Sequence, residues 1–330
     1  MMRVGIIGTG PAGCAAAIAL SRLGRKVILI GDDVDGVGEQ LHPAARPLLA
    51  SLGLSTLPDQ LECYGVRSAW HAPELAEQHF LSHPLGTGWL LDRRTFGQLL
   101  RQAAIRDGVL LRSPCRLTGI KREANSKEGW QLQLSKGEES CDWLIDATGR
   151  RGTLTRLLGV KRRIIHRQVA VVGWLRADQH DDHDQTLTVE STSKGWWYSC
   201  RLPQNRRVAG YVTGGKPEAE TWEDRLRATR HLGPLVKHYR VDQACVTRAA
   251  DSTILEQCFG PKWIAVGDAA VSYDPLASRG LVSALKSGLD AAVLVGASEE
   301  ELEAWQKELE THFAQYCDER ARWTGVENQD

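Results

Sequence analysis

The sequence predicts an α/β fold in which a Rossmann-like dinucleotide-binding domain carries an inserted antiparallel β-sheet. Three observations support this prediction: a strand–helix–strand pattern around a glycine motif at the start, mainly strand-like segments in the middle, and a buried strand followed by a long Ala- and Leu-rich helix near the end. The chain has 330 residues, of which 42% are hydrophobic, so it can bury a large core in about two domains.

The chain opens with a βαβ unit. Residues 3–8 form an apolar run typical of a strand buried on both faces, residues 11–23 predict a helix, and residues 26–30 predict a second strand. Strands joined in this way are expected to be parallel, with a right-handed crossover between them.

A glycine motif lies between the first strand and the helix. Gly8 permits a tight turn, Gly10 lets the backbone approach a pyrophosphate, and Gly13 allows close packing of helix against strand. The N-terminus of the helix supplies oriented N–H groups for the anion. The acid that binds the adenosine ribose is expected at the end of the second strand, but position 31 is Gly. Either Asp32 takes that role with a displacement of one residue, or another group does.

Beyond this unit, the patterns predict the remaining elements in order. The expected helices lie at residues 47–54, 94–107, 219–230 and 280–296, and residues 299–323 are charged and amphipathic. The expected strands lie at residues 109–112, 115–121, 130–134, 142–146, 166–176, 185–192, 196–202, 207–213, 240–249 and 263–267. We therefore expect a discontinuous nucleotide-binding domain (1–60, 92–163 and 251–330) and a substrate-binding antiparallel sheet domain (61–91 and 164–250).

Two later motifs extend the predicted nucleotide site. Residues 143–150 form a buried strand that ends in Asp-Ala-Thr-Gly, and residues 267–281 contain a Gly-Asp pair, a Pro-containing loop and the Gly-started beginning of a helix. The Asp268 carboxylate can accept hydrogen bonds from sugar-like hydroxyls, or it can cap a helix. The helix that begins near Gly280 can place N–H groups against an electron-rich ring edge.

Composition excludes several classes of protein. Lys plus Arg and Asp plus Glu both number 41, so the chain lacks the basic excess of a dedicated nucleic-acid or anionic-membrane binder. The eight Cys include no Cys-x-x-Cys pair, which argues against a zinc ribbon or a thioredoxin-like motif, and we expect no metal site. No apolar run reaches the roughly 18 residues of a membrane span, and the N-terminus does not resemble a signal peptide. A cytoplasmic protein with reduced thiols is expected.

Taken together, the motifs resemble those of the FAD-dependent monooxygenase and halogenase superfamily, which has the p-hydroxybenzoate-hydroxylase-like fold. The resemblance spans nearly the whole chain in the family order. Its pieces are the N-terminal glycine motif and residues 38–43, 91–96, 146–150 and 267–281.

The resemblance implies noncovalent FAD in an extended form. Arg93 would face the phosphates or the adenosine, although it can also be a solvated arginine at the start of a helix, and Asp268 would face the ribityl chain. The pyrophosphate would be held by Gly8, Gly10, Ala12 and Gly13, further contacts would come from Asp32, Gln40, Thr148 and Gly149, and the isoalloxazine would lie beside Pro275, Gly280 and Leu281. O₂ is implied as a co-substrate, with NAD(P)H or another reductant as a transient electron donor.

Two features distinguish branches of this superfamily. Residues 195–203 are similar to the Gly-Trp-x-Trp-x-Ile-Pro motif of tryptophan halogenases, but with different spacing. Residues 27–120, where the lysine of those halogenases would fall, contain no Lys, which argues against a halogenase. Residues 37–43, 68–71, 88–93 and 195–198 are more similar to flavoproteins that mature quinoprotein oxidases and dehydrogenases by acting on a precursor tryptophan during cysteine tryptophylquinone formation.

The expected function is hydroxylation of an aromatic ring, with a peptidyl tryptophan of a quinoprotein precursor as the implied substrate. The alternatives are a flavin-bearing maturation partner or chaperone, a flavin-dependent reductase of a lipid double bond, and a halogenase-like enzyme. His42 and Glu39 are weak catalytic candidates because they lie in the stretch expected to approach the flavin. Trp196 and Tyr198 should share one face of a strand, with Trp197 on the other, and they either bind the substrate or fill the core.

Overall fold

The N-terminal strand β1 (Arg3–Ile7) lies inside a six-stranded sheet in the computed structural model, which describes residues 1–32, 36–70, 72–122, 129–178, 182–215 and 221–325. The parallel neighbours of β1 are β2 (Lys26–Ile30) and β12 (Trp143–Asp146). The order is β20-β21-β12-β1-β2-β8, completed by β8 (Leu110–Arg112), β21 (Trp263–Ala265) and the antiparallel β20 (Phe259–Gly260). The expected βαβ unit is confirmed.

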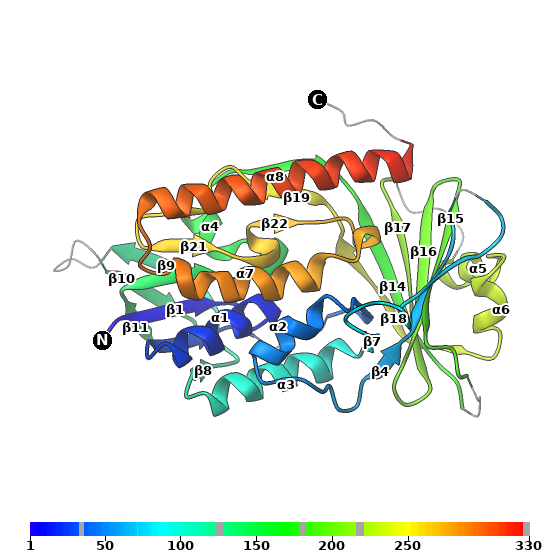
Figure 1. Cartoon of the computed structure of the whole chain (residues 1–330), viewed down its shortest axis with the longest axis horizontal. Coiled ribbons are helices and arrows are strands. Elements are labelled where there is room, and N and C mark those ends of the chain that lie inside the picture. Colours follow the sequence, from blue (N-terminus) through cyan, green and yellow to red (C-terminus); the bar gives the residue numbers. More distant parts are fainter. Residues whose placement is uncertain (33–35, 71, 123–128, 179–181, 216–220, 326–330) are drawn as a thin grey trace.

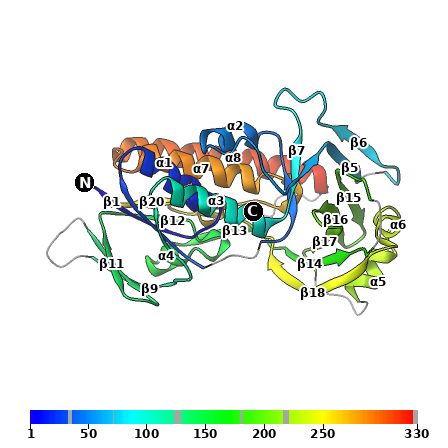
Figure 2. The same ribbon diagram turned by 90° about the horizontal axis from the view of Figure 1, so that it is seen from below.

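Helices cover one side of this sheet, and a small sheet covers the other (Figure 2). The helix of the βαβ unit, α1 (Pro11–Arg22), packs against α7 (Gly280–Leu294) so closely that a Cβ at Gly288 would lie 2.3 Å from the carbonyl oxygen of Ala12. The other helices near this sheet are α2 (Ala45–Ser51), α3 (Arg93–Arg106) and α8 (Glu299–Thr324), together with α4 (Thr153–Leu157), which contacts β9 (Leu117–Arg122) of the small sheet. The small sheet consists of β9, β10 (Trp130–Leu134) and β11 (Glu138–Cys141).

The C-terminal helix α8 begins with a capping box, in which Ser298 and Glu301 each accept a backbone hydrogen bond from the other. It runs along the length of the molecule, from the six-stranded sheet to the second large sheet (Figure 1). Two further small sheets lie between these ends. One contains β3 (Glu39–Leu41), β7 (Gly88–Leu91) and β4 (Leu61–Cys63), and the other contains β13 (Arg162–His166), β19 (Ser252–Leu255) and β22 (Val271–Ser272).

The second large sheet has seven strands, in the order β18-β14-β17-β16-β15-β5-β6. They are β5 (Gly65–Ala69), β6 (Ala76–His79), β14 (Val169–Arg176), β15 (Thr186–Thr192), β16 (Gly195–Leu202), β17 (Arg206–Thr213) and β18 (Arg240–Ala249). The sheet is not purely antiparallel as expected, because β15 pairs with β5 in parallel. These two strands are separated by more than a hundred residues, so no hairpin constrains their relative direction.

Two other expectations about this region need correction. The strand expected over residues 166–176 begins later, as β14 (Val169–Arg176), and the preceding β13 (Arg162–His166) was not predicted. Between them, the N–H of Gln168 donates to Asp251 Oδ1 (2.8 Å). The helix expected over residues 219–230 is α5 (Trp222–Arg227), followed by a separate α6 (Leu232–Val236); residues 219 and 220 lie outside the described part. The other elements expected after the βαβ unit lie within about three residues of their predicted bounds.

The two faces of the seven-stranded sheet have different neighbours. Trp196 and Tyr198 pack in a cluster that includes residues of β4 and β7, and Val37 and Leu276 pack against the same cluster. Trp197 packs on the opposite face, against Tyr211 and Trp222, beneath α5 and α6. The predicted alternation of the three aromatic residues is confirmed.

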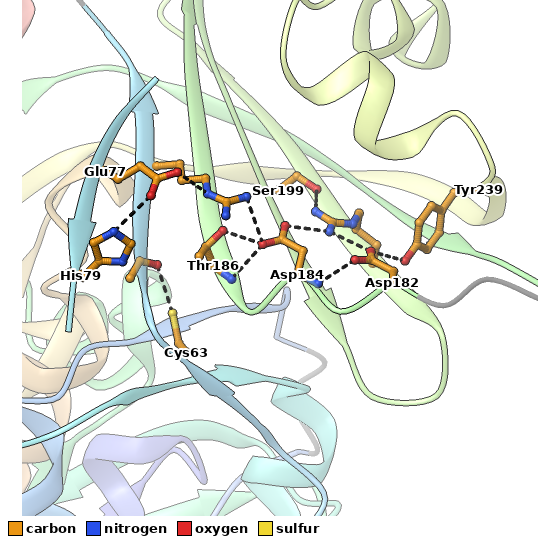
Figure 3. A network of polar contacts seen from close by, with 11 residues as sticks. Cys63, Glu77, His79, Asp182, Asp184, Thr186, Ser199 and Tyr239 are labelled. Atoms are coloured by element: carbon orange, nitrogen blue, oxygen red, sulfur yellow. Dashed lines mark hydrogen bonds and ion pairs between the residues drawn. The ribbon is translucent and has the colours of Figure 1, made fainter. Parts of the chain in front are cut away.

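A polar network crosses one end of this sheet (Figure 3). Its centre is Arg207, whose side chain is fully buried and whose Nη2 lies 2.9 Å from Asp182 Oδ2 and 3.0 Å from Asp184 Oδ2. The hydroxyl of Tyr239 donates to Asp182 Oδ2 (2.6 Å), and Arg207 Nη1 donates to Ser199 Oγ (3.2 Å). The pKa of Asp182 lies below its usual range because Arg207 and these hydrogen bonds outweigh the effect of burial.

Candidate functional site

Three glycines shape the loop between β1 and α1. Gly8 has a φ of +118°, and a Cβ there would lie 2.0 Å from the carbonyl oxygen of Ala147, so the fold itself requires glycine. The same holds for Gly13, where a Cβ would lie 1.9 Å from the carbonyl oxygen of Gly8. At Gly10, by contrast, a Cβ would meet no described atom within 4 Å. Gly10 is the N-cap residue of α1, so it opens space in front of the positive end of a helix.

The end of β2 explains why position 31 is not the expected acid. A Cβ at Gly31 would lie 3.0 Å from Cγ2 of Thr9, whose Oγ1 donates to the carbonyl oxygen of Asp32 (2.7 Å). A side chain at position 31 would therefore press against the Thr9 side chain from its first carbon onward. Asp32 remains the first acid after the strand and is partly exposed, and its contact with a ribose remains a prediction.

Four charged residues from distant segments lie close to the start of α1. One of them, Asp268, follows Gly267, where a Cβ would lie 2.9 Å from the Cβ of Ala12. The Arg93 guanidinium, at the start of α3, pairs with the carboxylate of Glu39 in β3, and Arg150 Nε lies 3.4 Å from Asp268 Oδ2. Burial raises the pKa of both carboxyls, and the charge of Asp268 raises that of Glu39 further, while Arg93 and Arg150 oppose the effect. Even so, the side chains of Glu39 and Asp268 are 37% and 32% accessible. The two acids therefore lie within the fold but at an accessible recess.

Two arginines bind the main chain at Asp268 and in the segment that follows it. Arg162 Nη1 donates to the Asp268 carbonyl oxygen (3.2 Å), and Arg150 Nη2 donates to that of Tyr273 (2.7 Å). Asp268 lies inside the short 3-10 helix Gly267–Ala269, whose N-cap residue is Val266, so Asp268 is not the N-cap residue that the sequence allowed as an alternative. Neither arginine was expected in this role from the sequence, because both lie far from position 268 along the chain and carry no local motif for it.

The Asp-Ala-Thr-Gly segment is fixed by its own side chains. Asp146 is fully buried and accepts hydrogen bonds from the N–H and hydroxyl of Thr148 (3.0 and 2.6 Å) and from the N–H of Thr155 (2.8 Å). The Thr148 hydroxyl also accepts from the N–H of Thr153 (2.6 Å). The Thr148 side chain is thus engaged within the protein, so a cofactor contact at Thr148 or Gly149 would involve the main chain.

Gln40, predicted to contact FAD, and His42, a catalytic candidate, both form hydrogen bonds within the protein. The Gln40 amide is buried and donates to Cys63 Sγ (3.3 Å), on the side of the strand opposite Glu39. His42 Nδ1 accepts from the N–H of Ala44 (3.2 Å), and burial together with the nearby His83 lowers the pKa of His42. His42 is therefore a neutral imidazole at neutral pH with one nitrogen already engaged. Of the similar segment 68–71, residue His71 lies outside the described residues.

Trp70, Trp196 and Tyr198 form an aromatic row within one hydrophobic cluster. The ring centroids of Tyr198 and Trp196 are 5.9 Å apart, and those of Trp196 and Trp70 are 6.1 Å apart. Burial raises the pKa of Tyr198, and the negative charge of Glu39 raises it further. Leu276, in the loop that follows Pro275, packs against the same cluster. At the start of α7, a Cβ at Gly280 would meet no described atom within 4 Å.

A family model described as tryptophan halogenase matches residues 60–295. The chain belongs to the tryptophan halogenase family. A second model, described as glucose inhibited division protein A, matches residues 3–57, which include the glycine motif. Within the described residues, no group of three or more His, Cys, Asp or Glu could hold a metal ion. No helix of that part is long and apolar enough to cross a membrane.

Named relatives cover most of the chain. A putative FAD-dependent oxidoreductase, LodB of Marinomonas mediterranea, is 28% identical over 94% of this chain and 89% of its own. A menaquinone reductase of Mycobacterium tuberculosis is 29% identical over 88% of this chain and 75% of its own. This member of the tryptophan halogenase family is a halogenase-like FAD-dependent oxidoreductase.

Solved structures confirm the fold. The flavin-dependent halogenase CmlS superposes with a TM-score of 0.83 at 21% identity, over 100% of this chain and 66% of its own. The peptidyl tryptophan dihydroxylase QhpG superposes with a TM-score of 0.80 at 24% identity, over 99% of this chain and 75% of its own. The predicted α/β class, with its Rossmann-like domain, is confirmed.

The residues at the recess fit FAD. The open space at Gly10 and the N-terminus of α1 suit a pyrophosphate, Arg93 is a cation for the phosphates, and the accessible Asp268 carboxylate can accept hydrogen bonds from ribityl hydroxyls. Arg93 is only 16% exposed, so it is not the solvated arginine that the sequence allowed as an alternative.

Proposed function

We propose that this protein is an FAD-dependent monooxygenase that hydroxylates the indole ring of a tryptophan carried by a quinoprotein precursor. The observation that carries the proposal is the aromatic row of Trp70, Trp196 and Tyr198, which packs in one hydrophobic cluster with Leu276. Aromatic side chains bind a flat aromatic substrate by edge and offset stacking. The fold that this chain shares with QhpG, a peptidyl tryptophan dihydroxylase, supports the choice of a protein-borne ring.

Two sequence features favour hydroxylation over halogenation. Residues 27–120 contain no Lys, and residues 195–203 depart from the tryptophan halogenase motif in spacing. When bound, FAD supplies the activation of O₂, with electrons from NAD(P)H or another reductant. The balanced reaction consumes the ring C–H, O₂, two electrons and two protons, and it yields a ring hydroxyl and water. Arg93 and Asp268 bind the cofactor, and the aromatic row orients the ring and excludes water.

A second candidate is a flavin-dependent reductase of a lipid double bond. The name of the menaquinone reductase, at 29% identity over 88% of this chain, favours it. The two reactions differ in what reaches the product: a monooxygenase inserts one oxygen atom from O₂, whereas a reductase adds two electrons and two protons. A maturation partner without turnover would produce neither change.

The test combines the holoenzyme, NAD(P)H, isotopically heavy O₂ and a Trp-containing precursor encoded beside this chain's gene. We expect the precursor to gain heavy oxygen on one tryptophan, detected by peptide mass spectrometry. Trp196→Leu should retain folding and FAD but lower this incorporation, and Trp197→Leu, on the opposite face, is the matched control. Reduction of a prenylated quinone with no oxygen in the precursor would establish the reductase instead. Binding of the precursor without either product would establish the maturation partner.

A further inference from the structure

The last turns of α8 contact the loop that follows β22. The N–H of Asp274 donates to the Tyr316 hydroxyl (2.8 Å), which also shares a hydrogen bond with Ser252 Oγ (2.6 Å). Arg320 Nε donates to Asp274 Oδ2 (2.9 Å), and the two side chains are only 9% and 1% exposed. Asp274 Oδ1 accepts from the N–H of Leu276 (2.9 Å), which closes the turn at Pro275. One carboxylate thus connects the loop to the helix.

The far end of the same loop is also held by α8. Arg279, which precedes α7, forms an ion pair with Glu319 (2.6 Å). Between the two attachments, Ser278 has a φ of +50°, a left-handed conformation that is unfavourable for a residue other than glycine. The loop is therefore held in a conformation that its own sequence does not favour, and contacts from α8 contribute to holding it.

One turn further along, α8 contacts the aromatic row. The Trp70 indole N–H donates to the carbonyl oxygen of Trp323 (2.6 Å), and the Trp70 ring lies edge-on to Trp196. Tyr316 and Trp323 are seven residues apart, which corresponds to about 10 Å along a helix. A helix is stiff over this distance, so the positions of the loop and of Trp70 are linked.

We propose that α8 is a positioning element that sets the distance between the flavin-side loop, residues 273–279, and the aromatic row. Tyr316 and Arg320 are positioning residues for the loop, and the Trp323 carbonyl is the positioning group for Trp70. The identity of the ring held by the row rests on the proposed function, whereas the effect on the loop does not. A misplacement of about 1 Å between reacting groups can lower a rate about a hundredfold, so a rigid link of this kind has a direct consequence for turnover.

The test for the loop compares Arg320→Met with Arg322→Met, which changes an exposed arginine in the same turn of α8. We expect Arg320→Met to weaken FAD binding about tenfold and to shift the absorption spectrum of the bound flavin, and Arg322→Met to do neither. Tyr316→Phe and Arg320→Lys provide milder variants if Arg320→Met does not fold. Equal FAD dissociation constants and spectra for the parent, Tyr316→Phe and both Arg320 variants would overturn the proposal.

The test for the aromatic row uses Trp70→Phe, which keeps a ring but removes the N–H donor to Trp323. We expect an unchanged flavin spectrum, with less hydroxylated product and more hydrogen peroxide for each NAD(P)H consumed. Unchanged coupling of NAD(P)H to product would overturn this part. If the parent enzyme hydroxylates no precursor, the proposed function fails, and the FAD measurements on Arg320 still decide the role of α8.

Discussion

Replacing Gly10 by alanine should separate cofactor binding from folding. The backbone of Gly10 has φ −78° and ψ −175°, which alanine adopts without strain, and the new Cβ would meet no described atom within 4 Å. Alanine is a poorer N-cap than glycine by about 0.5–1 kcal/mol. It also reduces the entropy of the unfolded chain, which stabilises the fold by about 0.4–1 kcal/mol. We therefore expect the free energy of unfolding of the apoprotein to change by less than about 1 kcal/mol.

The effect on FAD should be much larger. The added methyl group occupies the space in front of α1 through which a pyrophosphate approaches the N–H groups, and each hydrogen bond lost to a charged oxygen costs about 1.5–3 kcal/mol. Losing one such bond raises the dissociation constant of FAD about tenfold to a hundredfold or more. The measurements are the melting temperature of the apoprotein and a titration of FAD fluorescence.

Two matched glycines control this experiment. Gly215→Ala places a methyl group in ordinary contact, 3.4 Å from Thr213 Oγ1, and should change neither folding nor FAD binding. Gly13→Ala brings a Cβ within 1.9 Å of a backbone oxygen and should prevent folding. A Gly10→Ala protein that binds FAD as tightly as the parent would refute the assignment of this space to the pyrophosphate.

Three further predictions concern charged residues. Asp268→Ala should weaken FAD binding by about 1–3 kcal/mol, measured by the same titration, whereas Asp290→Ala, which removes the partner of Lys286 on α7, should not; equal affinities would contradict the ribityl contact. Because the pKa of Glu39 is raised and the phosphates are negative, FAD affinity should fall as the pH rises through that pKa, and Glu39→Gln should flatten this dependence. Arg207→Met should lower the free energy of unfolding by about 3–5 kcal/mol, because it removes the buried cation that pairs with Asp182 and leaves Asp184 paired with Arg67 at 3.6 Å; a loss below about 1 kcal/mol in urea unfolding would refute this. The pKa of Asp182 is lowered, so the network stabilises the parent above the pKa of an unfolded aspartate and loses that effect as the pH falls through the lower folded value.

Local patterns were sufficient for most elements of the fold. The alternation at residues 196–198 placed two aromatic side chains on one face and the third on the other, because side-chain direction in a strand depends only on position. The strand β5 was not among the expected strands, and its parallel pairing with β15 depends on contacts between segments far apart in the chain. The strand β13 was not expected either, and the hydrogen bond from Gln168 to Asp251 that follows it likewise joins distant segments.

The residues of the candidate site also fall into those that local sequence patterns predict and those that depend on distant contacts. The glycine positions could be predicted because each depends on the local backbone, which needs either a positive φ or space for a close contact. The arginines were not, because the partners of Arg150 and Arg162 are main-chain oxygens more than a hundred residues away. The same reasoning applies to Tyr316 and Arg320, which lie on a helix whose charged amphipathic sequence indicates only its length and its buried face.

The pairing of Arg93 with Glu39 has a consequence for how this site binds FAD. A cation that faces phosphates is more effective when no protein carboxylate competes for it, yet Arg93 is already paired and only 16% exposed. The phosphates must therefore share Arg93 with Glu39 or displace it, and the cost is smallest when Glu39 is protonated. Burial and the charge of Asp268 both favour that protonation. FAD binding should accordingly take up a proton at Glu39, and a calorimetric titration in buffers of different ionisation enthalpy measures that uptake directly. Zero proton uptake by the parent at the pH where its FAD affinity changes would show that another group controls the affinity.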